Sequence, residues 1–563
     1  MANDLIDSYI KITVEDEIHS EFLTIVDCLK HYANTQSETE AFVFASTDGS
    51  RQSVTWSELY NKSKAVAKSF VHLGVKEKEV VAMNIRNCPE WLYASYGAII
   101  AGAIPISVSF TYVDGSDLVA LMEKLQICSL LVMDPGLENI NWEIVRRLLD
   151  NFNANGTVKS SKMPYLRYLV GVSFDQVDAQ LQKFIDLVHD IKSGITLPKV
   201  SAKDTISLFQ TSGSTGVPKL VAHSHEAFFK CVTGKHAEYL DAKYKHFNDR
   251  PFAWLGGYPL SVITGQTRVA ISGFCKPPKD RVSFMIEVIQ RERCSSIVAL
   301  PPLMHELIKR QSDLPSDWPV IIIASGGQPM TKKITSCIGK SCKYLLCMYA
   351  ATEFVYLAKS LIADPENFTE YSCGKPMQFP GLEIKIVNDD GKIVPVNTRG
   401  EIYCRSPALF KEYFNDPIKT NAVKSVDGWF RTDDIGRLTE CGELFVEGRK
   451  SNMILSGGFN VAPEILEQVM KNFPGVEGVV IVPVPDDIYF QVLCACVVKK
   501  AGSDVTEEEL REVCSNYHAD KPGLFTVLPK FYLFFEKYPE TSTGKLNRKE
   551  LEKIANQRFK STS

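Results

Sequence analysis

Short apolar runs alternate with amphipathic stretches along the first 450 residues of the chain. The runs predict buried strands at residues 80–85, 104–108, 129–133, 205–209, 296–300, 320–324 and 343–348. Two of the intervening segments, residues 56–73 and 116–125, have helical character. Because strands that alternate with helices pair into covered sheets, this pattern predicts a large N-terminal α/β domain of layered sheets.

After residue 376 the pattern changes to short strands with polar turns. Strands are expected at residues 383–388, 400–405 and 443–447, separated by Asn-Asp-Asp-Gly and Asp-Gly turns. They predict a small β subdomain at residues 376–448, which completes an N-terminal domain of residues 1–451.

A further α+β pattern begins after Arg449. Strands are expected near residues 453–455, 479–484, 491–498 and 531–535, and helices at residues 463–470 and 506–517. Pro463 suits the first turn of its helix because proline lacks an amide hydrogen that this position would leave unpaired. These elements predict a small C-terminal α+β domain over residues 452–563.

Composition narrows the possible functions. The chain has 563 residues, too many for one core, and its 63 Lys and Arg against 67 Asp and Glu give a net charge of −4. Without a basic excess, no nucleic-acid partner is expected. Fifteen cysteines without a C-x-x-C pair or a signal peptide predict reduced thiols and a cytoplasmic location. Cys494 and Cys496 fit one face of a buried strand better than a metal site.

One uncharged stretch, residues 92–113, is long enough to span a membrane. Pro105 interrupts it, and polar residues dilute it. A buried helix at residues 91–101 followed by a buried strand at residues 104–108 explains the stretch better, so no transmembrane segment is expected.

The most informative segment follows the strand predicted at residues 205–209. It reads Thr211-Ser-Gly-Ser-Thr-Gly-Val-Pro-Lys219. Glycines let backbone N–H groups turn toward an anion, hydroxyls add donors, and a lysine adds charge. The glycine spacing differs from that of a P-loop. The residues expected to bind phosphate are Thr211, Ser212, Gly213, Ser214, Thr215, Gly216 and Lys219.

This segment resembles the phosphate-binding signature of the adenylate-forming superfamily, which includes acyl-CoA synthetases, aryl-CoA ligases, beetle luciferases and peptide-synthetase adenylation domains. In all, the resemblance to this family extends from about residue 55 to residue 551. Further motifs lie after the phosphate-binding segment, in the same order as in the family. They are Ser325-Gly-Gly-Gln-Pro329, Tyr349-Ala-Ala-Thr-Glu353, Trp429-Phe-Arg-Thr-Asp-Asp434, Gly448-Arg449 with Gly457-Gly458, and Pro539-Glu-Thr-Ser-Thr-Gly-Lys545.

The resemblance implies a set of roles around ATP. Thr352 would bond the α-phosphate, and Glu353 would hold Mg²⁺. Tyr349 would stack on adenine, and Asp434 would accept the ribose hydroxyls. The opposite adenine wall would consist of Gly327, Gln328 and Pro329.

It also implies roles for residues from the domain junction onward. Arg449 would contact ribose or phosphate, and Lys545 would bridge the substrate carboxylate and the α-phosphate. The C-terminal domain would be mobile and rotate about a hinge near Asn452. After rotation, Gly457 and Gly458 would line the route for CoA.

The chain departs from the family pattern at several positions. Ala350 and Asp433 stand where glycine is usual, and Asn452 replaces the common hinge aspartate. Asp tolerates a positive φ better than most residues, so Asp433 can replace a glycine there. The segment at residues 254–259 lacks the histidine often found in CoA ligases. The expected acyl pocket draws on Trp254, Gly256, Gly257, Tyr258, Ala350 and Ala351.

These observations predict an ATP- and Mg²⁺-dependent acyl-CoA synthetase that acts through an acyl-adenylate and releases pyrophosphate and AMP. An apolar acyl pocket favours a medium-chain fatty or aromatic acid, with CoA as the acceptor. Two alternatives remain open: a luciferase-like adenylating oxygenase, and a non-catalytic adenylate- or acyl-binding protein of the same fold. A hydrolase is disfavoured because no G-x-S-x-G motif occurs.

Overall fold

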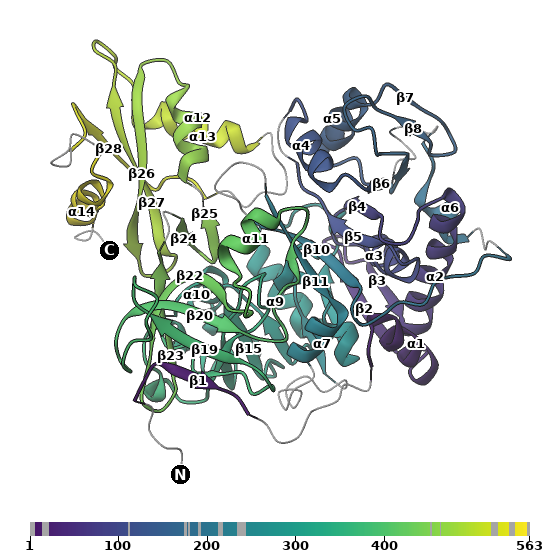
Figure 1. Cartoon of the computed structure of the whole chain (residues 1–563), viewed down its shortest axis with the longest axis horizontal. Coiled ribbons are helices and arrows are strands. Elements are labelled where there is room, and N and C mark those ends of the chain that lie inside the picture. The colour runs from purple at the N-terminus through teal and green to yellow at the C-terminus, as the bar shows by residue number, and fades with distance from the viewer. Residues whose placement is uncertain are drawn as a thin grey trace.

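The computed structural model places two large sheets side by side, with a third sheet and a C-terminal domain along one flank (Figure 1). It describes residues 6–13, 22–110, 113–173, 177, 181–189, 193–211, 218–232, 244–330, 332–450, 453–461, 463–519, 527–539 and 546–559. Within these residues, no helix combines the length and apolar character needed to cross a membrane.

The first sheet has seven strands in the order β21-β11-β10-β5-β4-β6-β9. Their bounds are β21 Glu412–Tyr413, β11 Lys219–Ser224, β10 Thr205–Thr211, β5 Ile104–Ser107, β4 Val80–Asn84, β6 Cys128–Met133 and β9 Tyr168–Gly171. The strands from β10 to β9 run parallel, while β11 turns back beside β10. The predicted phosphate loop is the connection between β10 and β11.

The second sheet has nine strands in the order β18-β17-β16-β15-β14-β12-β13-β2-β3. Their bounds are β18 Lys375–Pro376, β17 Ala358–Ile362, β16 Tyr344–Tyr349, β15 Ile322–Gly326, β14 Ser296–Val298, β12 Lys245–Phe247, β13 Thr267–Ile271, β2 Glu40–Ala45 and β3 Arg51–Thr55. Because β15 and β16 are parallel, their carboxyl ends meet at one edge. This brings the segment after Gly326 beside the segment after Tyr349.

Helices cover both sheets. They are α1 Ile25–Thr35, α2 Trp56–Leu73, α3 Pro89–Ile100, α4 Ser116–Leu125, α5 Ile140–Leu148, α6 Phe184–His189, α7 His225–Val232, α8 Ser261–Thr264, α9 Arg281–Glu292, α10 Pro301–Lys309 and α11 Pro417–Val423. Thr55 caps α2 by accepting from the Glu58 N–H, and Gly74 ends it with φ +94°. The predicted helices at residues 56–73 and 116–125 are confirmed by α2 and α4. The uncharged stretch is the end of α3 followed by β5, as predicted.

The third sheet has five strands in the order β1-β19-β20-β22-β23. Their bounds are β1 Tyr9–Lys11, β19 Glu383–Val387, β20 Gly400–Arg405, β22 Phe430–Leu438 and β23 Leu444–Arg449. The sequence predicted three of these strands but not β1 or β22. In the antiparallel pair β22–β23, Asp434 lies opposite Arg449.

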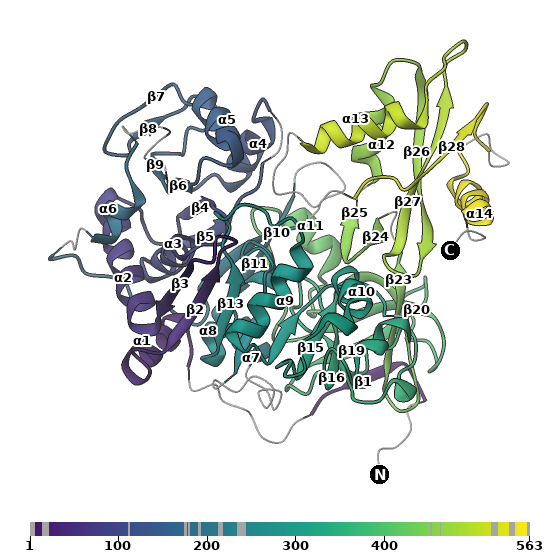
Figure 2. The same ribbon diagram turned by 180° about the vertical axis from the view of Figure 1, so that it is seen from behind.

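The C-terminal domain contains β24 Ile454–Ser456, β25 Phe459–Val461, β26 Val476–Asp486, β27 Phe490–Lys499 and β28 Phe531–Phe535, with α12 Pro463–Lys471, α13 Glu507–Ala519 and α14 Arg548–Phe559. Viewed from behind, α12 and α13 lie on one side of β26 and α14 on the other (Figure 2). Cys494 and Cys496 are buried in the layer that packs on α14, which confirms their prediction as core residues of one strand face. The two-domain α/β fold predicted from the sequence is therefore correct; the boundary at Asn452 lies outside the described residues.

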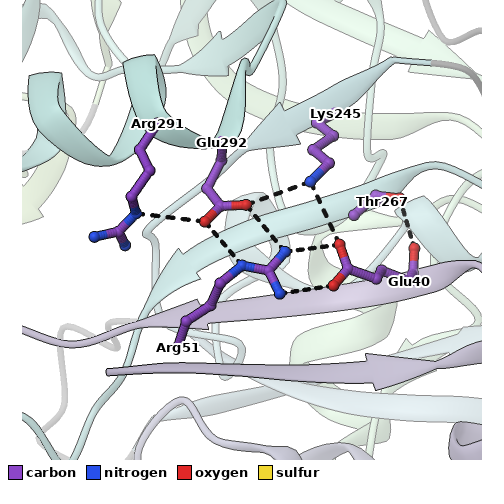
Figure 3. A network of polar contacts seen from close by, with 6 residues as sticks. All are labelled: Glu40, Arg51, Lys245, Thr267, Arg291 and Glu292. Carbon is purple, nitrogen blue, oxygen red and sulfur yellow. Dashed lines mark hydrogen bonds and ion pairs between the residues drawn. The ribbon is translucent and has the colours of Figure 1, made fainter. Parts of the chain in front are cut away.

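A charged network ties β12 to its neighbours at the start of the strand (Figure 3). Lys245 contacts Glu292 at 3.3 Å and Glu40 at 3.4 Å. Arg51 donates to Glu40 over 2.7 and 2.8 Å and to Glu292 over 3.0 and 3.1 Å. The network joins β2, β3, β12 and α9, and β12 then leads directly into the candidate site.

Candidate active site

One cavity of about 940 Å³ lies between the two domains. We call it the interdomain cavity. Most of the described site residues predicted from the sequence line it: Thr211, Lys219, Trp254, Gly256, Tyr258, Gly327, Gln328, Pro329, Tyr349, Ala350, Ala351, Thr352, Glu353, Asp434, Arg449 and Gly458. Segments far apart in the chain therefore share one site.

The two ends of the predicted phosphate loop face this cavity. Thr211 and Lys219 are register partners at the ends of β10 and β11. The Thr211 hydroxyl is buried without a hydrogen-bond partner among the described residues. Lys219 Nζ lies 4.9 Å from the ring centre of Tyr413. An unpaired hydroxyl and an ammonium at the loop base suit an anion. The predicted residues Ser212, Gly213, Ser214, Thr215 and Gly216 lie outside the described residues.

A buried carboxylate stands at the side of the cavity. The Tyr349 hydroxyl donates to Asp434 Oδ2 over 2.5 Å, and Arg449 Nε lies 2.8 Å from Asp434 Oδ1. Burial raises the pKa of Asp434 above its usual range, although Arg449 and Tyr349 oppose the shift. Asp433 has φ +63°, a positive value that Asp tolerates better than most residues, as predicted for this replacement of glycine.

Thr352 and Glu353 follow Tyr349 on the same loop. The backbone carbonyl of Thr352 accepts from His223 Nε2 over 2.6 Å, and Glu353 Oε1 accepts from the Tyr413 hydroxyl over 2.9 Å. Burial lowers the pKa of His223 to about 4, so its imidazole is neutral near pH 7. Among the described residues, no basic side chain lies within 4.0 Å of Glu353. An oriented carboxylate without a cationic partner can hold a hard metal ion such as Mg²⁺.

The C-terminal domain docks on the segment that follows β15. A Cβ added to Gly327 would lie 3.3 Å from Gly458 Cα, so the two backbones touch. Gln328 Nε2 donates to the Ile488 carbonyl over 3.1 Å, and the Trp254 ring packs on Phe459 with centroids 5.5 Å apart. Gly458 lines the cavity, whereas Gly457 does not and packs beside Tyr489.

Five of the six residues predicted for the acyl pocket line the cavity. Trp254, Gly256 and Tyr258 line the cavity, together with Ala350 and Ala351. Gly257 is not among the lining residues: its carbonyl accepts from Arg268, and an added Cβ would lie 2.0 Å from the Pro251 carbonyl oxygen. Its role is to let the chain turn. The lining also contains charged Arg250, so it is not uniformly apolar as the sequence suggested.

Lys545 lies outside the described residues, as does Asn452. The described segments on either side of Lys545 are held together within the C-terminal domain. The Asn547 N–H donates to the Pro539 carbonyl over 2.9 Å, and Arg548 pairs with Glu467. Neither Pro539 nor Asn547 lines the cavity.

The sequence did not predict three residues that touch this site: Tyr413 contacts Glu353, His223 contacts Thr352, and Arg250 lines the cavity. Tyr413 and Arg250 stand outside the matched motifs, and no local spacing marks them. For His223, the signal was its position on the strand that returns from the phosphate loop.

Fold and site together define a two-domain α/β protein in which two carboxylates, Glu353 and Asp434, share one cavity with Thr211 and Lys219. A family model described as "AMP-binding enzyme" matches residues 29–414, and one described as "AMP-binding enzyme C-terminal domain" matches residues 466–545. The chain therefore belongs to the AMP-binding enzyme family, and the predicted membership of the adenylate-forming superfamily is confirmed.

Curated relatives and solved structures agree with this assignment. The chain is 25% identical over 517 residues to 4-coumarate--CoA ligase 4 of Arabidopsis thaliana, covering 88% of this chain and 85% of the relative. It is 26% identical over 570 residues to the mitochondrial medium-chain acyl-CoA ligase ACSF2 of Danio rerio, covering 94% and 88%. The amide bond synthetase McbA of Marinactinospora thermotolerans shares the fold, with a TM-score of 0.75, 21% identity, and coverage of 95% and 100%.

Proposed function

We propose that this protein is an AMP-forming acid–thiol ligase that converts a carboxylic acid, ATP and CoA into an acyl-CoA thioester. The observation that carries the proposal is the meeting of Tyr349, Glu353 and Asp434 in one cavity with the phosphate-loop ends Thr211 and Lys219. The CoA-ligase names of the two relatives support the choice of reaction.

The first half-reaction activates the acid. A carboxylate oxygen attacks the α-phosphorus of ATP, the bond to the bridging oxygen breaks, and pyrophosphate leaves with that electron pair. The product is a mixed anhydride, the acyl-adenylate. Because two anions must approach, the site has to supply positive charge and oriented donors. Lys219, Arg449 and Lys545 are the cations proposed for this purpose.

The nucleotide would lie between the carboxyl ends of the strands and the β22–β23 pair. Tyr349 offers an aromatic face to adenine, with Gly327, Gln328 and Pro329 as the other wall. Asp434 offers a carboxylate to the ribose hydroxyls, and ionised carboxylates are strong acceptors. The loop at residues 211–219 would hold the phosphates that leave.

Glu353 is the residue proposed to hold Mg²⁺. Its carboxylate lines the cavity and is oriented by Tyr413, and no cation competes for it among the described residues. These features fit a metal that prefers oxygen ligands. Mg²⁺ bound there would neutralise charge on the phosphates of ATP.

The second half-reaction transfers the acyl group. The CoA sulfur attacks the carbonyl carbon of the adenylate, and AMP leaves. Two features of the described domain orientation support its use in this step. Gly458 reaches the cavity wall at Gly327, and the described segments flanking Lys545 do not line the cavity. We infer that the C-terminal domain rotates about residues near Asn452, so that Lys545 reaches the cavity in the first step. Closure would also keep water from the anhydride.

A direct assay tests this function. The purified protein is incubated with ATP, MgCl₂, CoA and a panel of fatty and aromatic acids, and AMP, pyrophosphate and thioester are quantified by mass spectrometry. Equal amounts of AMP and thioester are expected with at least one medium-chain or aromatic acid. AMP and light without thioester would favour the luciferase-like alternative. No AMP with any acid would favour a non-catalytic binding protein.

A further inference from the structure

The backbone of Arg250 is fixed where β12 opens into the cavity. Its N–H donates to the Asn248 side chain over 3.1 Å, and its carbonyl accepts from Asn87 over 3.0 Å and from Arg268 over 3.1 Å. With the backbone held from three sides, the Arg250 side chain lines the cavity beside Trp254, a residue predicted for the acyl pocket. There the guanidinium carbon lies 5.6 Å from the ring centre of Trp254.

The neighbouring arginine shows what a structural guanidinium looks like in this fold. Arg268 is buried and donates to the carbonyls of Asn248, Gly257 and Arg250. Its donors are occupied by backbone oxygens, as a buried cation requires. Arg268 therefore needs no ligand.

Arg250 lacks such partners. Its Nε is buried without an acceptor, and no carboxylate of the described chain lies within 4.0 Å of its guanidinium. The adjacent Asp249 is engaged elsewhere, by Arg281 Nη2 at 2.6 Å and the Ile271 N–H at 3.0 Å. Burial lowers the pKa of Arg250 to about 10, which still leaves the group cationic at neutral pH. An incompletely bonded cation in a cavity wall is costly unless a ligand completes it.

Gly256 leaves room for the Arg250 guanidinium, and the Tyr356 hydroxyl is a further hydrogen-bond donor in the cavity lining. A Cβ on Gly256 would lie 3.0 Å from Arg250 Nη1, so a side chain at position 256 would crowd the guanidinium. Tyr356 also lines the cavity, and burial raises the pKa of its phenol to about 12, so it keeps its proton. Tyr356 belongs to the segment that follows Glu353. The guanidinium of Arg250 and the protonated phenol of Tyr356 thus belong to residues that line the same cavity.

We propose that Arg250 binds a second carboxylate at the far end of the acid, so that the preferred substrate is a dicarboxylic acid rather than a simple fatty acid. This inference rests on the proposed ligase function and specifies its substrate class. A guanidinium can bind a carboxylate through two parallel N–H···O bonds, which fixes the length of the acid as well as its charge. Trp254 and Tyr258 would pack on the hydrocarbon between the two carboxylates.

The test compares matched acids and matched variants. Rates of CoA-dependent AMP release are measured for monocarboxylic and α,ω-dicarboxylic acids of equal chain length, and for aromatic mono- and diacids. The variants are Arg250→Met, which keeps bulk and removes charge, Arg250→Lys, and the exposed control Arg293→Met. Gly256→Ala serves as a second probe that crowds the guanidinium without removing it.

The wild type is expected to prefer one diacid over its monoacid by about 10-fold or more in kcat/KM. Arg250→Met should lower kcat/KM for that diacid by about 10- to 100-fold, mainly through KM, and raise it for the monoacid. Arg250→Lys should retain part of the preference, Gly256→Ala should lose part of it, and Arg293→Met should match the wild type. Melting curves check that each variant folds.

Two negative results are distinguishable. A wild type that uses monoacids as well as or better than every diacid, with the ratio unchanged in Arg250→Met, overturns this inference alone. A wild type that releases AMP with no acid of either kind overturns the ligase proposal, and this inference with it.

Discussion

Tyr349 and Asp434 are joined by a 2.5 Å hydrogen bond, although they come from different sheets. Tyr349 ends β16 of the nine-stranded sheet, and Asp434 lies on β22 of the five-stranded sheet. Because Arg449 holds the other carboxylate oxygen, contacts within the protein fix the orientation of the Asp434 carboxylate. A preoriented carboxylate loses little entropy when it binds a diol, which is what a ribose site requires.

Asp434→Asn should therefore weaken AMP binding. Loss of a charged hydrogen-bond acceptor corresponds to about 1.5–3 kcal/mol, so the Kd measured by isothermal titration calorimetry should rise ~10- to 100-fold. Asp433→Asn is the matched control, since asparagine also tolerates the φ of +63° at that position. Equal weakening by both substitutions would contradict a specific ribose role for Asp434.

Glu353→Gln should raise the Mg²⁺ concentration needed for half-maximal pyrophosphate release. Tyr413→Phe removes only the orienting hydrogen bond to Glu353. Outer partners of metal ligands typically affect metal affinity by ~10-fold or more, and loss of the ligand itself should exceed this. Titration of the rate with MgCl₂ measures both effects. Unchanged Mg²⁺ dependence in Glu353→Gln would exclude it as a metal ligand.

Lys545→Ala should separate the two half-reactions. Without its charge, pyrophosphate release should fall by about 100-fold or more, while thioester formation from a supplied acyl-adenylate should persist. Lys549→Ala, on α14 in the same basic segment, should affect neither step. Equal loss of both half-reactions in Lys545→Ala would argue against the rotating-domain account.

Gly458→Ala should show the opposite pattern. An added Cβ would lie 3.0 Å from Leu300 Cδ2, and φ is +85°, so the docked orientation would be strained. We expect thioester formation to slow by about 10-fold, which corresponds to ~1–2 kcal/mol, with adenylation little changed. Gly502→Ala is the control because Gly502 has φ +77° with open space around it. Slower adenylation in Gly458→Ala would contradict this assignment of the orientation.

The charged network at β12 should make stability depend on pH. Hydrogen bonds from Arg51 lower the pKa of Glu40 to about 2; burial favours a higher pKa for Glu292, but Arg51 and Lys245 outweigh it and lower that pKa too. The pKa of each of these two carboxyls is thus lower in the folded protein than in the unfolded chain. Their stabilisation is complete above the ordinary carboxyl pKa of about 4.3 and is lost as the pH falls toward 2.

Glu292→Gln should destabilise the protein near pH 7 and reduce this acid sensitivity. We expect a cost of about 1–2 kcal/mol, below the value for a fully buried pair because Arg51 and Lys245 are about one-third exposed. Glu287→Gln, on the exposed side of the same helix, is the control. Urea unfolding at pH 7 and pH 3 measures both effects, and identical curves for the two variants would refute the role of the network.

The sequence predicted those elements whose structure depends on residues close to them in the chain. Trp56–Leu73 carries its own cap, apolar face and terminal glycine, and α2 has the predicted bounds. Strand β1 was missed because, among the described residues, its sheet neighbour is β19, more than 370 residues later in the chain, and a three-residue run carries no pairing signal. The predicted strand at residues 296–300 ends early at Val298, because Pro301 opens α10.

The site residues likewise fall into those that local motifs predicted and those that only the tertiary structure brings together. Motifs identified the groups expected around the nucleotide, since Tyr349, Glu353 and Asp434 sit in recognisable local patterns. Arg250 and Tyr413 belong to no such pattern, and only the tertiary fold brings them to the cavity. Arg250, the residue that we propose selects the acid, was therefore beyond the reach of the sequence.

The central claim is that the acid carboxylate becomes joined to the α-phosphate of ATP. The most direct measurement uses the best acid from the panel, labelled with ¹⁸O in its carboxylate, with ATP and CoA. The account predicts ¹⁸O in the AMP that is released and none in pyrophosphate. Thioester formed with unlabelled AMP, or with ADP and phosphate in place of AMP and pyrophosphate, would contradict it.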